Sequence, residues 1–273
     1  MNKDQRVIEE FGEEWKKFEH GDLNKASLLK SFDQYFSIFP WSSLSLVSEG
    51  FDMGCGSGRW AQFVAPKVTL LNCVEPSDAI NVAKNNLKLF SNVRFLNETT
   101  ENCSLKTSSQ DFGYCLGVLH HIPNTKNALA DCSRLLKSGA PFLLYLYYNF
   151  DNKPFWFKFI WIISDLIRKV VSKFPQPLKK FTSEIIALLI YFPLARIALL
   201  CERLKLNPLN IPLSDYRKKP YYQMRNDSLD RFGTRLEQRY SKDQIRTMLT
   251  ETGFNNIIFS NETPYWCCVA YKK

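Results

Sequence analysis

Three glycines at alternate positions are the residues best suited to binding a small molecule. Residues 50–61 read GFDMGCGSGRWA and place Gly54, Gly56 and Gly58 between an apolar run and a helical stretch. Because glycine has no Cβ atom, a ligand can lie directly against the backbone of such a turn. The dinucleotide-binding pattern G-x-G-x-x-G would require a further glycine where Arg59 stands, which disfavours NAD and FAD. A plain tight turn is the alternative interpretation.

Two acidic residues belong with this turn. Asp52 directly precedes the glycines, and its carboxylate could organise the loop through the loop amides. Glu75 ends the apolar run TLLNCVEP, about 20 residues downstream, where a doubly wound fold presents a carboxylate to the hydroxyls of a ribose. The turn and Glu75 together indicate a ligand that contains adenosine. Without the glycines, Glu75 would be interpreted as an exposed carboxylate at the end of a strand.

Alternating strands and helices must position these residues. Short apolar runs alternate with helical stretches from residue 48 to residue 148, and the pattern returns after residue 236, which predicts an α/β doubly wound sheet. Amphipathic helical patterns over residues 5–20 and 28–39 come before it. We therefore expect three parts: an N-terminal helical cap over 1–40, a core over 41–150 and 236–273, and a helical, basic insertion over 151–235.

Four motifs in this order resemble those of the class I S-adenosylmethionine-dependent methyltransferases. The stretch DMGCGSG at 52–58 resembles the glycine-rich motif I of that family, and Glu75 resembles its ribose-binding acid. LHHIP at 119–123 resembles the end of the family's fourth strand, and RLLKSG at 134–139 the turn before its fifth strand. The resemblance implies a Rossmann-like, mostly parallel sheet of seven strands whose last strand, over residues 265–271, is antiparallel.

The resemblance also implies a cofactor and the residues that bind it. S-adenosyl-L-methionine would lie across the carboxyl ends of the strands. The adenine contact stays open between Glu98 and Thr99, because the stretch NETT stands where many family members have an acidic residue. The implied cofactor-binding residues are Asp52, Gly54, Gly56, Gly58, Glu75, Thr99 and Gly117.

Methyl transfer to oxygen or nitrogen is helped by a general base with a pKa near neutrality, which favours histidine. His120 is the candidate base, since the end of the fourth strand faces the transferable methyl group in this family. Tyr147, at the end of the fifth strand, is a second candidate for contact with the acceptor. The alternatives are that His120 packs beneath the cofactor and that Tyr147 belongs to the core.

The charge of the chain is distributed unevenly. Residues 1–150 carry 15 basic and 16 acidic side chains, and residues 151–273 carry 21 and 11, so the net charge of +9 lies in the second half. Guanidinium groups bind carboxylate and phosphate in a forked geometry, so we expect the insertion to form a lid over an anionic acceptor. A solvated basic face with internal salt bridges is the alternative. The candidate acceptor-binding residues are Arg217, Arg225, Arg231, Arg235 and Tyr240.

Two strongly apolar segments lie in the insertion, over residues 155–174 and 185–200. The second has sixteen residues, is interrupted by Pro193 and Arg196, and falls short of the roughly 20 apolar residues that a membrane-spanning helix needs. Burial against the sheet is one expectation for residues 155–200. Peripheral contact with a membrane, which would deliver a lipid-linked substrate, is the other.

These patterns predict an S-adenosylmethionine-dependent methyltransferase of type EC 2.1.1, acting at oxygen or nitrogen of an anionic small-molecule, lipid-linked or sugar-linked acceptor. A nucleic-acid methyltransferase is one alternative, but LHHIP replaces the [ND]-P-P-[FYW] tetrad of the amino-methylating enzymes, so nucleic acid is not the expected partner. A non-catalytic protein that binds the cofactor is another, and the intact glycines and Glu75 argue against it.

The cysteine and histidine content indicates whether the protein binds a metal and in which cellular compartment it works. The eight cysteines form no C-x-x-C pair, and the chain has three histidines, so we expect no metal site and a reducing compartment. The N-terminal stretch lacks the apolar segment of a signal peptide, which favours a cytoplasmic protein with peripheral membrane contact as an option.

Overall fold

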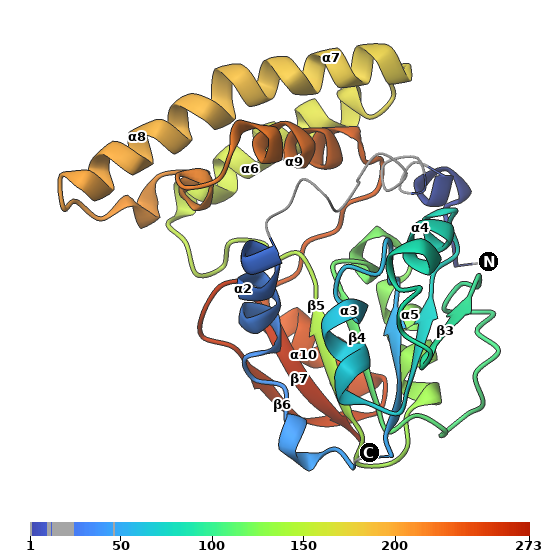
Figure 1. The fold of residues 1–273 in the computed structure, drawn as a ribbon. Coiled ribbons are helices and arrows are strands. Elements are labelled where there is room, and N and C mark those ends of the chain that lie inside the picture. Colours follow the sequence, from blue (N-terminus) through green and yellow to red (C-terminus); the bar gives the residue numbers. More distant parts are fainter. Residues whose placement is uncertain (1, 10–11, 13–24, 46) are drawn as a thin grey trace. The chain divides into compact units, whose positions relative to one another are not determined.

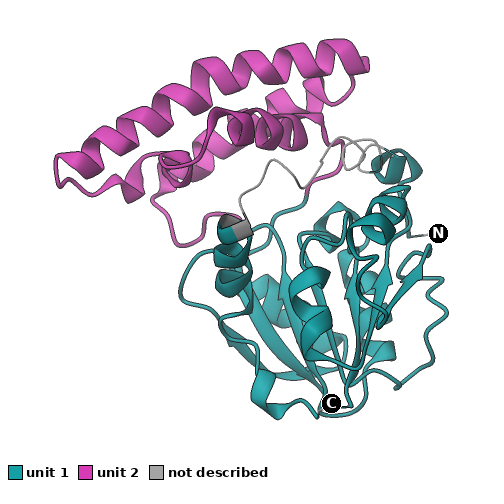
Figure 2. Ribbon diagram, viewed as in Figure 1, with its two compact units in different colours: residues 1–148, 238–273 teal, residues 149–237 magenta. Residues whose placement is uncertain are grey.

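The chain divides into two compact units, which we call the sheet unit and the helical unit. The computed structural model describes residues 2–9, 12, 25–45 and 47–273 (Figure 1). The sheet unit comprises Met1–Tyr148 and Gln238–Lys273, and the helical unit comprises Asn149–Glu237 (Figure 2). Each unit is described by itself below.

One sheet of seven strands organises the sheet unit. The strand order is β3-β2-β1-β4-β5-β7-β6, with β1 to β5 parallel and β7 antiparallel to both of its neighbours. The predicted Rossmann-like sheet with an antiparallel last strand is confirmed. The strands are β1 (Glu49–Met53), β2 (Leu70–Val74), β3 (Val93–Leu96), β4 (Phe112–Leu116), β5 (Pro141–Tyr145), β6 (Phe254–Phe259) and β7 (Cys267–Lys272).

Two reciprocal glycine–phenylalanine pairs join the central strands β1 and β4. Gly50 lies opposite Phe112, and Phe51 lies opposite Gly113. A Cβ atom on Gly50 would come within 2.2 Å of the Phe112 ring, and one on Gly113 within 2.3 Å of the Phe51 ring. Each glycine therefore makes room for the ring on the neighbouring strand, and both phenylalanines are fully buried.

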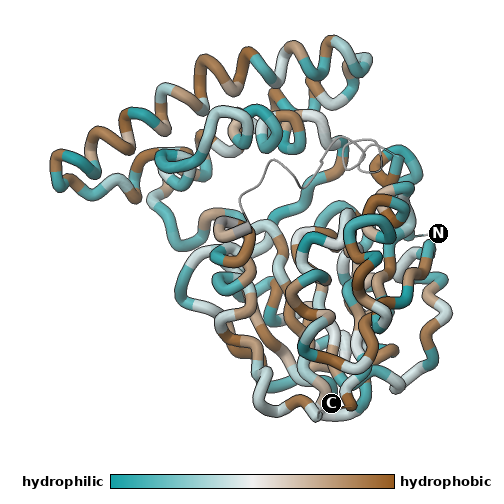
Figure 3. The backbone as a smooth tube through the Cα atoms, in the orientation of Figure 1, coloured by the Kyte–Doolittle hydropathy of each residue, from teal (hydrophilic) through white to brown (hydrophobic). Residues whose placement is uncertain are grey.

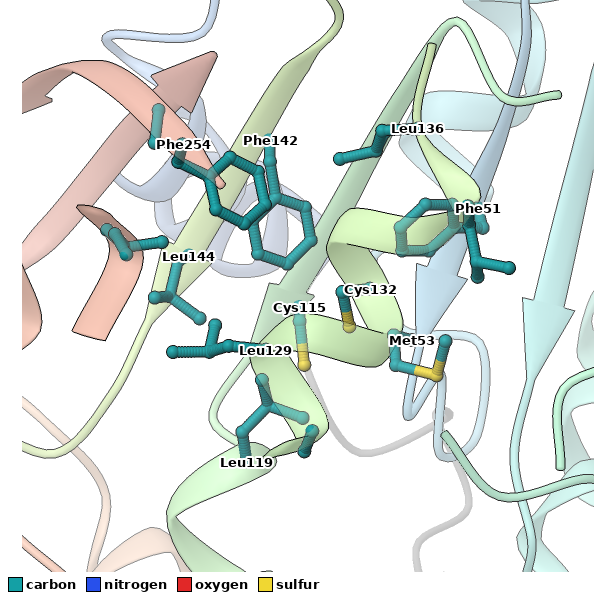
Figure 4. Close-up of a cluster of buried hydrophobic side chains, with 14 of the residues drawn as sticks. Phe51, Met53, Cys115, Leu119, Leu129, Cys132, Leu136, Phe142, Leu144 and Phe254 are labelled. Carbon is teal, nitrogen blue, oxygen red and sulfur yellow. The ribbon is translucent and has the colours of Figure 1, made fainter. Parts of the chain in front are cut away.

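Helices cover both faces of the sheet, since each strand buries side chains on both sides. On one face, α5 and α10 pack over a core that includes Phe51, Phe142 and Leu144 (Figure 4). On the other face, α2, α3 and α4 pack over Leu71, Phe112 and Tyr114 among others. These helices are α2 (Lys25–Phe36), α3 (Ala61–Val64), α4 (Ala79–Asn86), α5 (Thr125–Leu135) and α10 (Lys242–Glu251).

Of the two N-terminal helices that the periodicity predicts, the second corresponds to α2. Its buried side chains Phe32 and Phe36 stack on each other with ring centroids 4.3 Å apart. The first, predicted over residues 5–20, is helical at residues 5–9 and 12, and the rest of it lies outside the described residues.

The helical unit contains α6 (Phe155–Val171), α7 (Gln176–Ile186), α8 (Phe192–Arg203) and α9 (Tyr221–Gly233). A π-helical turn, Ala187–Tyr191, joins α7 to α8, so residues 176–203 form one continuous helix of 28 residues. Pro193 does not interrupt this helix as the sequence suggested. The Phe192 N–H donates to the carbonyl of Ala187, and this wider π-helical turn accommodates Pro193, which would disrupt a regular α-helix at this point.

By length and composition the helix over residues 176–203 could cross a membrane, and it is the one such helix among the described residues. In the hydropathy-coloured tube, brown, hydrophobic residues run along α7 and α8, whereas α9 is mainly teal and white (Figure 3). The helical unit thus combines one strongly apolar helix with one polar helix.

Candidate functional site

The glycine-rich turn follows β1 and contains three left-handed backbone conformations. Gly54, Gly56 and Gly58 have φ values of 77°, 54° and 79°, which side chains other than glycine rarely adopt. The Gly54 N–H donates to the carbonyl of Val74 at 2.8 Å, so the turn is tied to the end of β2. A Cβ atom on Gly54 would come within 2.5 Å of Val118, which directly precedes the turn that holds His120.

Glu75, at the end of β2, links the turn to the neighbouring loop. One carboxylate oxygen accepts a hydrogen bond from the Gly56 N–H at 3.0 Å, and the other accepts one from the Ser77 N–H at 3.0 Å. The Asn97 side chain donates to the Glu75 carbonyl at 2.9 Å. Each carboxylate oxygen has a second lone pair, so Glu75 can hold the loop and still accept hydrogen bonds from a ligand.

Asp52 is buried at the base of the turn. Burial raises the pKa of this carboxyl to about 8, and the Tyr114 hydroxyl on the neighbouring strand offsets part of the increase. The Oδ2 atom has no hydrogen-bond partner within the described part of the chain. An unpaired, buried carboxylate oxygen is costly unless a ligand supplies a partner, and a cationic group would be the most effective one.

Two further predicted residues lie in loops that follow strands. Gly117, after β4, has a φ of 79°, and a Cβ atom there would meet no atom within 4 Å. Thr99, after β3, accepts a hydrogen bond from the Asn102 N–H at 3.3 Å. The neighbouring Glu98 accepts one from the Ser104 N–H at 2.7 Å, so both candidates for the adenine contact also shape the 98–104 loop.

His120 is fully buried in a short 3-10 turn, Leu119–His121, after β4. Its ring stacks on Tyr147 with centroids 3.8 Å apart. Neither ring nitrogen has a hydrogen-bond partner among the described residues. Burial lowers the pKa of His120 well below its ordinary value of 6.5, and the charges of His121 and Arg239 act in the same direction. The imidazole is therefore neutral at neutral pH, and its lowered pKa makes it a weaker base than an exposed histidine.

Residues 238–240 form backbone hydrogen bonds with His120 and with Tyr147, on which His120 stacks. The Gln238 N–H donates to the His120 carbonyl at 3.1 Å, and the Tyr240 N–H donates to the Tyr147 carbonyl at 2.9 Å. Between them, the Arg239 guanidinium lies over the Tyr147 ring, 5.2 Å from its centroid. Arg239 was not among the predicted site residues, although its charge and its place beside Tyr240 were visible in the sequence.

The five predicted acceptor-binding residues do not form one cluster. Arg217 pairs with Glu202 at 3.1 Å, and Arg225 pairs with Glu184 at 2.9 Å. Arg231 is half-buried in the helical unit and donates to Ser164 at 3.0 Å. The Arg235 carbonyl accepts a hydrogen bond from Arg168 at 2.8 Å. Tyr240 belongs to the sheet unit, where its hydroxyl lies 2.8 Å from the Thr125 hydroxyl. An acceptor-binding role for these residues stays a prediction.

Comparison with known proteins bears on the sheet unit. Residues 51–144 match the family model described as a methyltransferase domain. Relatives include the ubiquinone biosynthesis O-methyltransferases of Saccharophagus degradans and Klebsiella pneumoniae, 26% and 28% identical over 133 residues. These alignments cover 48% of this chain and 55% and 54% of the relatives, so the chain spans about half the length of the curated relatives it matches.

Solved structures extend the likeness to nearly the whole chain. A methyltransferase of Thermotoga maritima is 14% identical with a TM-score of 0.50, and the match covers 98% of this chain and 99% of that one. A protein of Haloferax volcanii, solved with the Trm112 methyltransferase activator, is 11% identical with a TM-score of 0.50 and covers 97% and 98%. At these identities the likeness shows the fold. The strand order, the glycine-rich turn and the family match agree, and the chain carries a class I S-adenosylmethionine-dependent methyltransferase domain.

Proposed function

We propose that this protein transfers a methyl group from S-adenosyl-L-methionine to an oxygen atom of an anionic small-molecule or lipid-linked acceptor. The observation that carries the proposal is His120, a fully buried imidazole whose two nitrogens lack partners among the described residues. An oxygen acceptor has a proton to lose, and a neutral histidine is the side chain suited to take it. The names of the relatives, which are O-methyltransferases, support oxygen as the atom that is methylated.

The residues around the glycine-rich turn fit the proposed cofactor. The unpaired Asp52 carboxylate oxygen suits the positive charge of an ammonium or sulfonium group, which would lower the pKa of this buried carboxyl. Glu75 has lone pairs for the ribose hydroxyls. Gly54, Gly56 and Gly58 give the turn the left-handed backbone conformations that a glycine-rich cofactor loop requires. When bound, the cofactor supplies an electrophilic methyl group on a positively charged sulfur.

The protein's own contribution is to hold the acceptor and to take its proton. A nitrogen of His120 accepts the proton of the acceptor hydroxyl, and stacking on Tyr147 holds the imidazole in place. Arg239, over the Tyr147 ring, helps to keep His120 neutral, because its positive charge lowers the pKa of the imidazole. Alignment of the acceptor in a site that excludes water supplies much of the rate.

Substitution of His120 tests the proposal. With a panel of phenolic and carboxylated acceptors and labelled S-adenosylmethionine, we expect methyl transfer by the natural protein. His120→Gln should lower kcat by about 10²–10⁴-fold, the usual contribution of a general base, with cofactor affinity unchanged. Tyr265→Phe, which alters an aromatic residue that lies near Tyr148, serves as the control and should retain kcat. Full activity of His120→Gln would exclude the histidine as the base.

The acceptor contact of the helical unit has its own test. We propose that the insertion over residues 151–235 acts as a lid and contributes basic residues to the acceptor site. Arg235→Gln should raise KM for an anionic acceptor several-fold and leave kcat and cofactor affinity in place, as expected for uniform binding. An unchanged KM would remove Arg235 from the acceptor site.

A further inference from the structure

The helical unit has a small apolar core but also many large apolar side chains on its surface. In residues 149–237, all of which the structure describes, Val171, Ile186 and Phe232 belong to the core, and a few charged or hydroxyl-bearing side chains are buried as well. Arg168 and Lys179 are 4% exposed, and Ser183 and Ser228 are fully buried or nearly so. Exposed apolar side chains on the same helices include Phe159, Ile163, Leu166, Leu188, Leu189 and Ile197. So many exposed large apolar side chains on a few helices are unusual for a surface that faces water alone.

The polar interior of the unit is well connected. Arg168 donates to Asp165 and to the carbonyls of Thr234 and Arg235, all within 3.0 Å. The Ser228 hydroxyl donates to the Ser183 carbonyl at 2.8 Å. These bonds and a small apolar core tie α6, α7 and α9 together, and the exposed apolar side chains of α6 and of the α7–α8 helix lie outside that core. Intramembrane polar groups that face one another rather than lipid show the same arrangement.

The apolar surface is continuous along the α7–α8 helix. Between residues 185 and 200, every exposed residue is apolar. Exposed basic residues stand near the ends of the apolar segments: Lys158 near the start of α6, Lys173 after its end, Lys180 in α7, and Arg203 and Lys205 at the end of α8. Helices with an apolar face and basic borders bind at membrane interfaces.

The net charge of the helical unit indicates what kind of partner covers its apolar faces. The helical unit carries 16 basic and 8 acidic residues, a net charge of +8. A second copy of the chain would bring two such units together, and their like charges would oppose association. A bilayer that contains anionic lipids offers both hydrocarbon for the apolar faces and negative charge for the basic residues.

We propose that the helical unit is a peripheral membrane-binding module, whose apolar faces on α6 and α7–α8 enter the interface of a bilayer with anionic lipids. The α7–α8 helix lies in the interface rather than across the bilayer. One of its faces, with Lys179 and Ser183, packs against α9, and α9 carries the exposed Arg225. A spanning helix would draw these polar groups into hydrocarbon, which is costly. The proposal stands whatever the acceptor of the sheet unit is.

Vesicle sedimentation with the full chain tests the proposal. We expect the protein to sediment with vesicles of phosphatidylcholine and phosphatidylglycerol, less with phosphatidylcholine alone, and less as salt concentration rises. Ile163→Glu on α6 and Leu189→Glu in the π-helical turn should each weaken partition about tenfold or more, because each places a charge in the apolar face. Leu89→Glu is the matched control, since Leu89 is 88% exposed in the sheet unit, and it should bind as the natural protein does.

Further measurements separate the competing explanations. Circular dichroism and S-adenosylmethionine binding should be the same for all three variants, which shows that they fold. An alkaline carbonate wash should release the protein from vesicles. Retention after the wash would indicate a spanning helix and would overturn the interfacial arrangement. Failure to sediment with any vesicle, together with a dimer in sedimentation velocity that Leu189→Glu dissociates, would assign the apolar faces to a second copy instead.

Discussion

At the scale of single residues, the candidate site contains groups whose pKa values or backbone conformations differ from the ordinary ones. Asp52 is a carboxyl with a raised pKa, His120 is an imidazole with a lowered one, and burial is the leading cause of both shifts. Three glycines hold positive φ values beside them. Such groups reduce the stability of the protein without its ligands and are concentrated where ligands bind.

Asp52 makes stability depend on pH in a specific direction. Its pKa in the folded protein, about 8, exceeds the ordinary value of 3.8, so the folded state binds the proton more tightly than the unfolded state does. The resulting contribution is fully present below pH 3.8 and is lost as pH rises to about 8. Asp52→Asn removes this dependence.

Denaturant unfolding of the cofactor-free protein should reveal that difference. Relative to the natural protein, Asp52→Asn should gain free energy of unfolding as pH rises from about 4 to about 8, reaching several kcal/mol at about 1.4 kcal/mol per unit of pKa shift. A difference that stays constant over this range would mean that Asp52 is ionised in the folded protein at neutral pH.

His120 should determine the acid limb of the activity profile. The pKa of this histidine lies well below 6.5, so the base remains unprotonated at neutral pH. With saturating cofactor, kcat should be constant through neutrality and fall only well below pH 6.5. In the residual activity of His120→Gln this limb should be missing. A limb at or above pH 6.5 that persists in the variant would contradict the assignment.

Gly54 can be tested against a glycine that shares its backbone conformation. Gly54 and Gly139 have φ values of 77° and 78°, but a Cβ atom would overlap Val118 at Gly54 and meet nothing within 4 Å at Gly139. Gly139→Ala should lower the free energy of unfolding by about 1–2 kcal/mol through backbone strain. Gly54→Ala should lower it by roughly 1–3 kcal/mol more and weaken cofactor binding. If denaturant unfolding shows that the two variants lose the same free energy of unfolding, Val118 can move aside without cost.

At the scale of elements, local sequence patterns predicted the turns and helix ends that depend on neighbouring residues, but not the contacts between distant residues. The glycine-rich turn was predicted from adjacent residues, and local signals also mark α10, which begins after the capping residue Ser241 and ends before Gly253 with a φ of 90°. The contact of Arg239 with Tyr148 could not be predicted, because the two residues lie 91 positions apart. The continuous helix over 176–203 escaped prediction because proline ordinarily predicts an interruption, and a π-helical turn cannot be inferred from composition.

The stability of the helical unit should depend on one buried ion pair of α6. Asp165 accepts hydrogen bonds from Arg168, whose side chain is 5% exposed, and from Lys169, whose side chain is 60% exposed. Arg168→Met leaves Asp165 and two carbonyls without their buried donor, so it should destabilise the unit by about 3–5 kcal/mol.

Hydrogen exchange of the α6 amides can measure this effect against a matched control. Lys169→Met removes the exposed partner of the same carboxylate and should cost at most about 1 kcal/mol. Exchange should therefore accelerate strongly in Arg168→Met and little in Lys169→Met. Similar rates in both variants would show that the polar interior does not hold the unit together.

At the scale of the whole molecule, the two units differ in charge and in the features they carry. The sheet unit carries the methyltransferase domain and the groups that fit a cofactor, and most of the net charge of +9 lies in the helical unit. The charge was visible in the sequence, but the inward orientation of Arg168 and Arg231 was not, since it depends on how α6 and α9 pack. Composition therefore predicted a basic insertion, and packing shows that part of its charge is internal.

S-adenosylmethionine binding is the property of this protein that tests the proposed cofactor site most directly. Isothermal titration of the natural protein should show one site with a sub-millimolar Kd, and NAD should give no heat. Glu75→Gln should weaken binding about 10–100-fold, the usual range for losing a charge-assisted hydrogen bond, whereas Glu262→Gln at an exposed position should bind normally. If the folded natural protein gives no heat with S-adenosylmethionine, or if Glu75→Gln binds as tightly as the natural protein, the proposed cofactor site is contradicted.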